Sequence, residues 1–279
     1  MKSDRFSPGE YWQRRVQGDI DLGVVGQRSL GRAYNEYIYK RRIDVLQDTL
    51  ESIHVDPSLC NILDIGCGSG YYVNYWHTLG IRQLQGVDIS ADSVSKLQKL
   101  YPQYTFTQAD ITAEDSAAQL TGKFSIITIF DVLYHITDDE KIRSLLKTVE
   151  GCLKEDGYVI IFDQLCKHDY MLSPHVKFRS EQMFTGLLRQ AGLAVIKKQP
   201  LFVFLAPPIY GNKYIDVLVS GFYKILGYLM KASYPIGNAM GRWVYHLDGV
   251  LRKANISTPN HALFLIQKSK SDVTEKTIK

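Results

Sequence analysis

The fold is decided by the stretch Ile62-Leu63-Asp64-Ile65-Gly66-Cys67-Gly68-Ser69-Gly70, an apolar run that carries one acid and ends in three glycines at alternate positions. The run predicts a buried strand that leads through a glycine-rich turn into a helix. Glycines at a strand end let the backbone pass close to a ligand, and a nucleotide-like ligand commonly requires this. The spacing excludes the G-x-G-x-x-G dinucleotide fingerprint, because Tyr71 stands where that motif has its third glycine.

Downstream of this turn, apolar runs alternate with helical patterns. Strands are expected at 60–65, 83–88, 104–109, 124–130, 158–162, from 193 and at 261–267, and a turn at 154–157. Helices are expected at 69–79, from Ser90 to before Pro102, from a capping box at 137–140 to Gly151, and from Ser180 to near Gly192. This alternation predicts an α/β fold with a Rossmann-like, doubly wound and mostly parallel sheet.

Three acids stand at or near the ends of the first three expected strands. They are Asp64, Asp88 and Asp110. Because ligands of such sheets bind at the carboxyl ends of the strands, we expect these three carboxylates along one edge, beside the glycine turn.

The glycine turn resembles the first motif of the class I S-adenosylmethionine (SAM) dependent methyltransferases, E/D-x-G-x-G-x-G. Asp64, Gly66, Gly68 and Gly70 match it. The segment 131–136, Asp-Val-Leu-Tyr-His-Ile, looks like the D-V-L-x-H-x segment that follows the fourth strand in many small-molecule members. The resemblance covers residues 60–200 and the strand near 262–267, and it implies SAM as the cofactor and an antiparallel last strand.

The resemblance also implies a role for each strand end. Asp88 would accept hydrogen bonds from the ribose hydroxyls, and Asp110 from the adenine amino group, with Ile111 on the ring. Asp64 would order the α-ammonium, directly or through water, and Phe130 and Asp131 would close the methionine side. The expected cofactor-binding residues are Asp64, Gly66, Cys67, Gly68, Gly70, Asp88, Ile89, Asp110, Ile111, Phe130, Asp131 and Tyr34.

A hydroxyl acceptor needs its proton removed, and an imidazole with an ordinary pKa of about 6.5 suits that task. His135 follows the fourth strand directly and is the first candidate for the base; the alternative is that it only shapes the pocket. Tyr134 would bound the acceptor or contact the sulfonium, or simply pack. His168 and His175, in the loop after the fifth strand, are second choices.

Two segments lie outside the alternation, which gives four expected units: a helical lid at 1–55, the core at 56–205, a helical insertion at 206–258, and the last strand and tail at 259–279. If the N-terminal helix lids the cofactor, Tyr34 or Arg28 would contact the methionine carboxylate. The insertion carries an apolar helical stripe between residues 215 and 229. It is interpreted either as a cap over an apolar acceptor pocket or as an interfacial helix on a membrane, with nearby lysines and arginines at the headgroups.

Composition and charge identify no partner. The net charge of +4 over 279 residues is too weak for a nucleic-acid footprint, and no nucleic-acid partner is expected. No [N/D]-P-P-[Y/F/W] segment follows the fourth strand, which disfavours the exocyclic-amino and glutamine methylases. The four cysteines form no C-x-x-C pair, so core thiols and no metal site are expected, and the polar N-terminus predicts a cytoplasmic protein.

These observations predict a SAM-dependent methyltransferase that acts on a small-molecule or lipid-like acceptor, at oxygen. Methylation at nitrogen is the nearest alternative. A SAM-binding or scaffolding domain without activity is an alternative of another class, and a nucleotide-sugar or NAD oxidoreductase is disfavoured by the glycine spacing.

Overall fold

The structure is a computed structural model, and it describes residues 29–113, 120, 123–231, 233–254 and 256–269. Its main sheet has seven strands in the order β3-β2-β1-β4-β5-β9-β8. All neighbours are parallel except that β9 runs antiparallel to both β5 and β8. The strands are β1 (Asn61–Ile65), β2 (Gln83–Asp88), β3 (Thr105–Gln108), β4 (Phe124–Phe130), β5 (Leu153–Gln164), β8 (Leu193–Pro200) and β9 (His261–Lys268).

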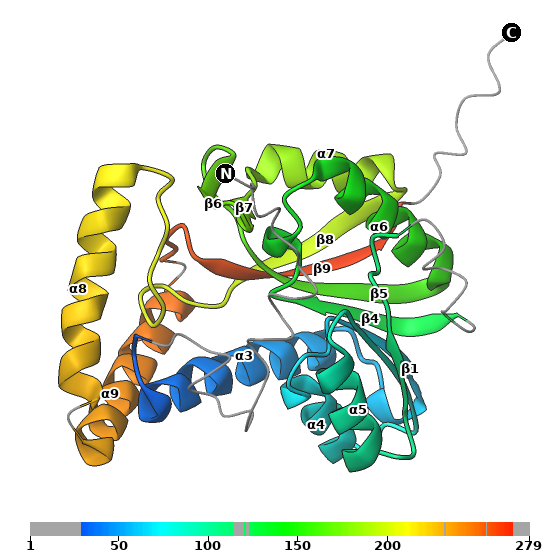
Figure 1. Ribbon diagram of the computed structural model, residues 1–279, viewed down its shortest axis with the longest axis horizontal. Helices are drawn as coiled ribbons and strands as arrows, with labels where there is room; N and C mark the ends of the chain where they lie inside the picture. Colours follow the sequence, from blue (N-terminus) through cyan, green and yellow to red (C-terminus); the bar gives the residue numbers. More distant parts are fainter. Residues whose placement is uncertain (1–28, 114–119, 121–122, 232, 255, 270–279) are drawn as a thin grey trace, which may run out of the picture.

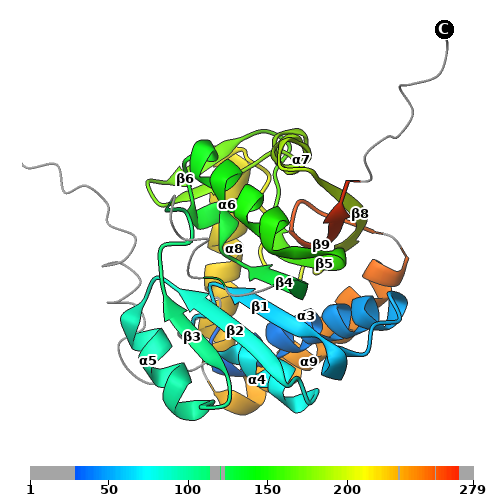
Figure 2. The same cartoon turned by 90° about the vertical axis from the view of Figure 1, so that its right-hand side faces the viewer.

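Helices cover both faces of this sheet (Figures 1 and 2). Neighbouring residues of one strand point to opposite faces, so Ile62 and Ile126 belong to one apolar core, and Leu63 and Ile127 to the other. The first core packs against α3 (Arg32–Ser52), α4 (Tyr71–Thr78) and α5 (Ala91–Leu100), and the second against α6 (Asp139–Cys152) and α7 (Glu181–Gln190). The expected doubly wound, mostly parallel α/β architecture with a final antiparallel strand is therefore confirmed.

The strand order reverses between β1 and β4, which places a crevice at the carboxyl ends of these two strands. The short helix η3 (Leu133–His135) follows β4 at this edge, and the hairpin of β6 (Tyr170–Ser173) and β7 (Val176–Phe178) follows β5. The sequence did not predict this hairpin. A further short helix, η1 (Pro57–Leu59), precedes β1 at the opposite end.

The junction of α6 and β5 differs from the prediction. Helix α6 begins after Asp138, whose side chain accepts from the N–H of Glu140, and it passes through Gly151 without a break. Strand β5 then begins at once, where a turn at 154–157 was expected. Its pairing with β4 jumps from Phe124–Leu153 to Ile126–Tyr158, so residues 154–157 form a bulge within the strand, with 154–156 exposed and Gly157 buried.

Three helices outside the alternation pack on each other. Helix α8 (Lys213–Lys231) and α9 (Tyr234–Lys253) form a hairpin at the left of Figure 1, and α9 lies against α3. Glycines of α9 allow this close approach, because a Cβ on Gly241 would lie 2.5 Å from the ring of Tyr37, and one on Gly249 would lie 2.6 Å from Arg41. The expected helical face at 215–229 thus belongs to a hairpin of two long helices.

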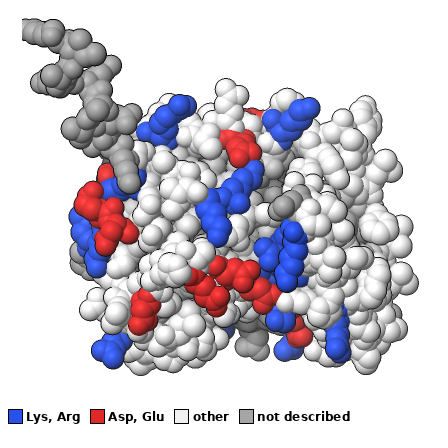
Figure 3. Space-filling view, turned by 180° about the vertical axis from the view of Figure 1, so that it is seen from behind, with Lys and Arg blue, Asp and Glu red and all other residues white. Residues whose placement is uncertain are grey.

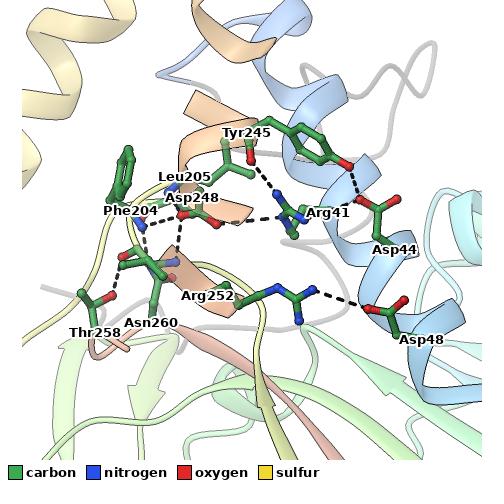
Figure 4. A network of polar contacts seen from close by, with 12 residues as sticks. Arg41, Asp44, Asp48, Phe204, Leu205, Tyr245, Asp248, Arg252, Thr258 and Asn260 are labelled. Carbon is green, nitrogen blue, oxygen red and sulfur yellow. Dashed lines mark hydrogen bonds and ion pairs between the residues drawn. The ribbon is translucent and has the colours of Figure 1, made fainter. Parts of the chain in front are cut away.

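A buried carboxylate ties this hairpin to the sheet (Figure 4). The Asp248 side chain of α9 accepts three backbone N–H groups, from Val203, Phe204 and Leu205, at 2.7–2.9 Å. Its other oxygen lies 4.0 Å from Arg41 Nε of α3. Segment 201–206, α9 and α3 therefore meet at one fully buried carboxyl group, of which one oxygen accepts three backbone amides and the other has no hydrogen-bond partner among the described residues.

Candidate active site

A cavity of about 670 Å³ opens at the carboxyl ends of β1, β2 and β4. One side, the glycine half, is formed by residues 65–69, 87–89 and 109–112. The other side, the histidine half, draws on α3, the residues after β4, segment 201–206 and the start of β9. Its lining includes Ile38, Tyr39, Arg42, Phe130, Asp131, Tyr134, His135, Ala206 and His261.

The glycine half is a turn that only glycine fits. Gly66, Gly68 and Gly70 have φ angles of 75°, 48° and 80°, in the left-handed region that favours glycine. A Cβ on Gly66 would also lie 2.3 Å from Val132 Cγ2, whereas one on Gly68 would meet nothing closer than 3.7 Å. The turn is therefore tight where it touches the protein and open beside the cavity.

Asp88 orders this turn as well as lining the cavity. One carboxylate oxygen accepts the N–H of Gly68 at 2.7 Å, and the other accepts the N–H of Ser90, the N-cap of α5, at 2.8 Å. Burial raises the pKa of Asp88, and these backbone donors oppose that shift. Each oxygen retains a further lone pair, so the carboxylate can still accept from a ligand.

Asp64 lies behind the turn and does not line the cavity. The hydroxyl of Thr128 donates to one of its oxygens at 2.6 Å, and the other oxygen has no hydrogen-bond partner among the described residues. Burial raises the pKa of Asp64 to about 7, although the bond from Thr128 opposes it. A buried carboxylate with an unbonded oxygen fits a ligand that brings a cation or an N–H donor.

The histidine half contains a buried cluster of three charged or titratable groups. Arg42 of α3 pairs with Asp131, and His261 Nε2 lies 3.6 Å from the other oxygen of Asp131. Burial alone would raise the pKa of Asp131, but the opposing effects of Arg42 and His261 outweigh it, so the pKa is lowered. Burial, aided by Arg42, lowers the pKa of His261 to about 4, so this imidazole is neutral at pH 7.

His135 is held by the main chain of the β6–β7 hairpin. Its Nδ1 lies 3.3 Å from the carbonyl oxygen of His175, and a carbonyl only accepts, so the contact requires the proton on Nδ1. In that tautomer Nε2 is the basic nitrogen. The Tyr134 ring packs 4.4 Å from the His135 ring, and burial raises the pKa of its phenol, which therefore stays protonated at neutral pH.

Most of the residues that the sequence singled out meet at this cavity. Its lining includes Gly66, Cys67, Gly68, Asp88, Ile89, Asp110, Ile111, Phe130, Asp131, Tyr134 and His135. The lining does not include Asp64, Gly70, Tyr34 or His168. Gly70 instead caps α4, where a Cβ would lie 2.2 Å from Leu97.

Tyr34 and His168 both lie outside the cavity lining, in different surroundings. The Tyr34 hydroxyl is buried and donates to the carbonyl of Leu205 at 3.1 Å, and the same helix reaches the cavity further along, through Ile38 and Arg42. His168 is exposed on the turn that leads into the β6–β7 hairpin, outside the cavity lining. Arg28 lies outside the described residues.

Sequence reasoning missed Arg42 and His261. The position of His261 was within reach, because an antiparallel last strand starts at the edge where its parallel neighbours end, and His261 pairs with Gln164, the last residue of β5. No comparable signal marks Arg42, since a basic residue on a helix most often faces solvent.

Burial raises the pKa of the four thiols, Cys60, Cys67, Cys152 and Cys166, so none is an activated nucleophile. Across the described ranges, no group of three or more His, Cys, Asp or Glu side chains could hold a metal ion. The groups that the cavity offers to a ligand are carboxylates, backbone amides, hydroxyls, imidazoles, aromatic rings and the cations of Arg42 and Lys141.

These groups suit SAM. The open face of the turn at Gly68 gives room for a close backbone approach, Asp88 and Asp110 supply acceptors for hydroxyl and amino groups, and Asp64 keeps an unbonded oxygen behind the turn. Apolar Ile89 and Ile111, which directly follow the two acids in the sequence, also line the cavity and can flank a base.

Comparison with known proteins agrees with this geometry. Residues 34–198 match the family model described as a methyltransferase domain. The ubiquinone biosynthesis O-methyltransferase of Paraburkholderia phymatum is 33% identical over 100 residues, which cover 35% of this chain and 41% of that protein. The mRNA cap guanine-N(7) methyltransferase of Schizosaccharomyces pombe is 31% identical over 130 residues, covering 42% and 36%. These matches span less than half the length of either relative.

Solved structures share the fold at low identity. A SAM-dependent methyltransferase from Clostridium acetobutylicum gives a TM-score of 0.52 at 13% identity, covering 83% of this chain and 92% of that one. The O-methyltransferase from a trans-AT PKS multienzyme of Brevibacillus brevis, in complex with S-adenosyl-L-homocysteine, gives 0.52 at 14% identity, covering 91% and 81%. Because the family model matches more than half of the chain, this protein belongs to the class I SAM-dependent methyltransferases, in which SAM is the methyl donor.

Proposed function

We propose that this protein transfers a methyl group from SAM to a hydroxyl oxygen of a small-molecule or lipid-like acceptor. The observation that carries this proposal is that one cavity joins the glycine half to a half lined by His135, in the tautomer that makes Nε2 basic, beside Tyr134 and His261. Bound SAM supplies a methyl group on a sulfonium, and the residues of this chain have to bind it, orient the acceptor and take up a proton.

Residues of the glycine half hold the cofactor in this proposal. Asp88 binds the ribose hydroxyls. Asp110 binds the adenine amino group, and Ile111 packs against the adenine ring. Asp64, from behind the turn, interacts electrostatically with the α-ammonium group. Phe130 and Asp131 bound the methionine side, where Arg42 offers a cation to a carboxylate.

Residues of the histidine half act on the acceptor. His135 Nε2 accepts the hydroxyl proton, and the protonated Tyr134 phenol donates a hydrogen bond that orients the acceptor. Helix α3 lines this end of the cavity through Ile38, Tyr39 and Arg42, and Ala206 lines it from the start of segment 206–258. The protein is proposed to act in the cytoplasm.

Oxygen is favoured over nitrogen because a neutral amine carries a lone pair without a base, whereas a hydroxyl needs one. The activities named for the relatives support this in part: several are ubiquinone biosynthesis O-methyltransferases, and one is a cap guanine-N(7) methyltransferase. Methylation at nitrogen is therefore the second candidate.

Two measurements test the proposal. Isothermal titration should show SAM binding, and a screen of phenols, catechols and matched anilines with methyl-labelled SAM should label the hydroxyl compounds. Labelling of amines alone would replace oxygen by nitrogen. Tight SAM binding without turnover on any acceptor would indicate a SAM-binding scaffold, and no SAM binding would overturn the assignment altogether.

A further inference from the structure

The α8–α9 hairpin exposes a wide apolar face. On α8 the side chains of Tyr214, Leu218, Ile225 and Tyr228 recur at helical spacing, and 81%, 74%, 66% and 80% of their surfaces are exposed. Phe222 and Leu229 of α8 are also exposed, and on α9 Ile236, Trp243, Leu247 and Val250 are exposed at helical spacing. We call these ten side chains the hairpin face. Contiguous exposed apolar surface of this kind marks an interaction site.

The charges that segment 206–258 itself carries are mostly positive. Segment 206–258 has six Lys or Arg residues and two Asp, a surplus of four that equals the net charge of the whole chain. Of the two acids, Asp248 is fully buried, and Asp216 is partly exposed and accepts the N–H of Tyr210. The exposed charged residues of the two helices are Lys213, Lys224, Lys231, Arg242 and Lys253. No Asp or Glu shows along the right-hand edge of Figure 3, where this end of the molecule lies.

A second copy of this chain fits the hairpin face poorly. A two-fold dimer pairs a patch with itself, so the exposed lysines and arginines of the two helices would mostly meet like charges. A partner with an apolar interior and anionic groups at its surface would match both the apolar side chains of the hairpin face and the lysines and arginines beside them. Anionic phospholipid does this, since acyl chains accept the apolar side chains and headgroups pair with the cations.

We propose that the hairpin face docks on an anionic lipid bilayer, with α8 and α9 lying in the interface. A search of the described residues finds no helix with the length and apolar content that a membrane span needs. Trp243 and the tyrosines suit the headgroup level, where one end of the ring is apolar and the other wet.

The docked hairpin is coupled to the cavity. Tyr223 of α8 donates to the carbonyl of Phe204, Asp248 of α9 accepts from the same segment, and Ala206 of this segment lines the cavity. Segment 207–211 also reaches the carboxyl end of the sheet, where Cys166 Sγ lies 3.5 Å from the carbonyl of Ile209. Resting on the proposed function, this path brings a lipid-borne hydroxyl acceptor to the active site from the bilayer.

Sedimentation with vesicles tests the docking without any methyl transfer. The full chain should bind vesicles of phosphatidylcholine and phosphatidylglycerol, and bind phosphatidylcholine alone much less. Leu218→Glu should weaken partitioning by about tenfold or more, because it removes one inserted side chain and adds an anion. Leu59→Glu is the matched control: Leu59 is 79% exposed but lies in η1, at the other end of the sheet, so this variant should bind like wild type.

A charge variant separates the electrostatic contribution. Lys224→Ala should weaken binding to the anionic vesicles by about fivefold, since each cation near such a surface contributes about 1 kcal/mol. Lys99→Ala, an exposed lysine at the end of α5, should change nothing. Added salt should reduce the difference between the two variants.

The emission of Trp243, taken as the difference from Trp243→Phe, should shift to shorter wavelength on anionic vesicles as the ring leaves water. Failure of the wild type to sediment, equal binding by Leu218→Glu, or an unshifted Trp243 would overturn the docking. So would a dimer that Leu218→Glu dissociates while vesicle binding persists. Titration with SAM runs in parallel: vesicle binding without SAM binding would refute only the function, and SAM binding without vesicle binding only the docking.

Discussion

The two halves of the cavity are assembled in opposite ways. The glycine half comes from residues 65–112, where three successive strands end beside one another, and its shape is fixed by glycine sterics and backbone hydrogen bonds. The histidine half gathers Arg42, His135 and His261 from distant parts of the chain, and a buried ion pair holds it together. A family can keep the first half and still vary the second, because the second depends on residues outside the repeated strand–helix pattern.

The largest expected effect is the pH dependence of the free energy of unfolding that Asp64 causes. The folded-state pKa of Asp64, about 7, lies above its ordinary value of 3.8, so the native state binds the proton more tightly and stability falls as pH rises between these values. In wild type, Asp64 should lower the free energy of unfolding by about 4 kcal/mol as the pH rises through this range, and Asp64→Asn should remove this decrease. Urea denaturation at a series of pH values measures it, with Asp92→Asn, an exposed acid of α5, as the control.

Asp163, whose pKa burial also raises to about 7, contributes a similar slope in wild type and both variants, so only the difference between the curves counts. Identical pH profiles for wild type and Asp64→Asn would show that Asp64 is ionised in the folded state.

His135→Ala should lower turnover by about 10²–10³-fold while leaving SAM affinity nearly unchanged, because removing a base affects the chemical step and not cofactor binding. The control is His168→Ala, which removes an exposed imidazole outside the cavity lining and should turn over like wild type. Steady-state kinetics with a labelled acceptor compares the two. If both variants keep wild-type rates across pH, His135 only shapes the pocket.

His261 should give a pH dependence of the opposite sign to Asp64. Its folded-state pKa of about 4 lies below the ordinary 6.5, so the unfolded chain binds the proton more tightly and stability rises with pH between these values. His261→Gln should remove a rise of about 3 kcal/mol, read from the same urea series. A rise that survives the substitution would mean that Asp131 keeps His261 charged in the native state.

Gly70→Ala should lower the free energy of unfolding by about 3 kcal/mol, because the new methyl group meets Leu97 and the φ of 80° disfavours a side chain. Gly80→Ala separates these causes: its φ is 75°, but nothing lies within 4 Å of the added Cβ, so about 1 kcal/mol is expected. Equal losses would show that steric packing at the turn contributes nothing.

Asp88→Ala should raise the dissociation constant for SAM about tenfold, because the variant loses an acceptor and leaves the N–H groups of Gly68 and Ser90 unpaired. Asp92→Ala changes a nearby exposed acid and should bind as wild type does. Titration calorimetry measures both. Unchanged affinity in Asp88→Ala would remove this carboxylate from the cofactor site.

The sequence predicted the glycine half well because its information is local. Strands β2 and β4 have the predicted bounds, Ser90 and Ser180 cap α5 and α7 as expected, and the strand-end acids Asp88 and Asp110 line one cavity. Hydrophobic runs, caps and strand ends all lie within a few residues of each other, so periodicity alone reveals them.

The histidine half was predicted only where it adjoins β4. His135 and Tyr134 line the cavity as expected, but a helix face cannot be oriented before its packing partner is known, so Tyr34 was chosen where Ile38 and Arg42 line the cavity. Exposure of His168 depends on the β6–β7 hairpin, whose short strands gave no periodic signal. Residues brought together by tertiary packing remain beyond one-dimensional patterns.

The three hydrogen bonds from the backbone amides of residues 203–205 to Asp248 limit which segments can be exchanged between this protein and its relatives. A chimaera in which only α8 and α9 are replaced would leave those three amides without their hydrogen-bond acceptor. The adjoining segment, whose Ala206 lines the cavity, would then lose its attachment to α9. An exchange of segments with a relative must therefore include all of residues 201–258, together with the surface of α3 that carries Arg41.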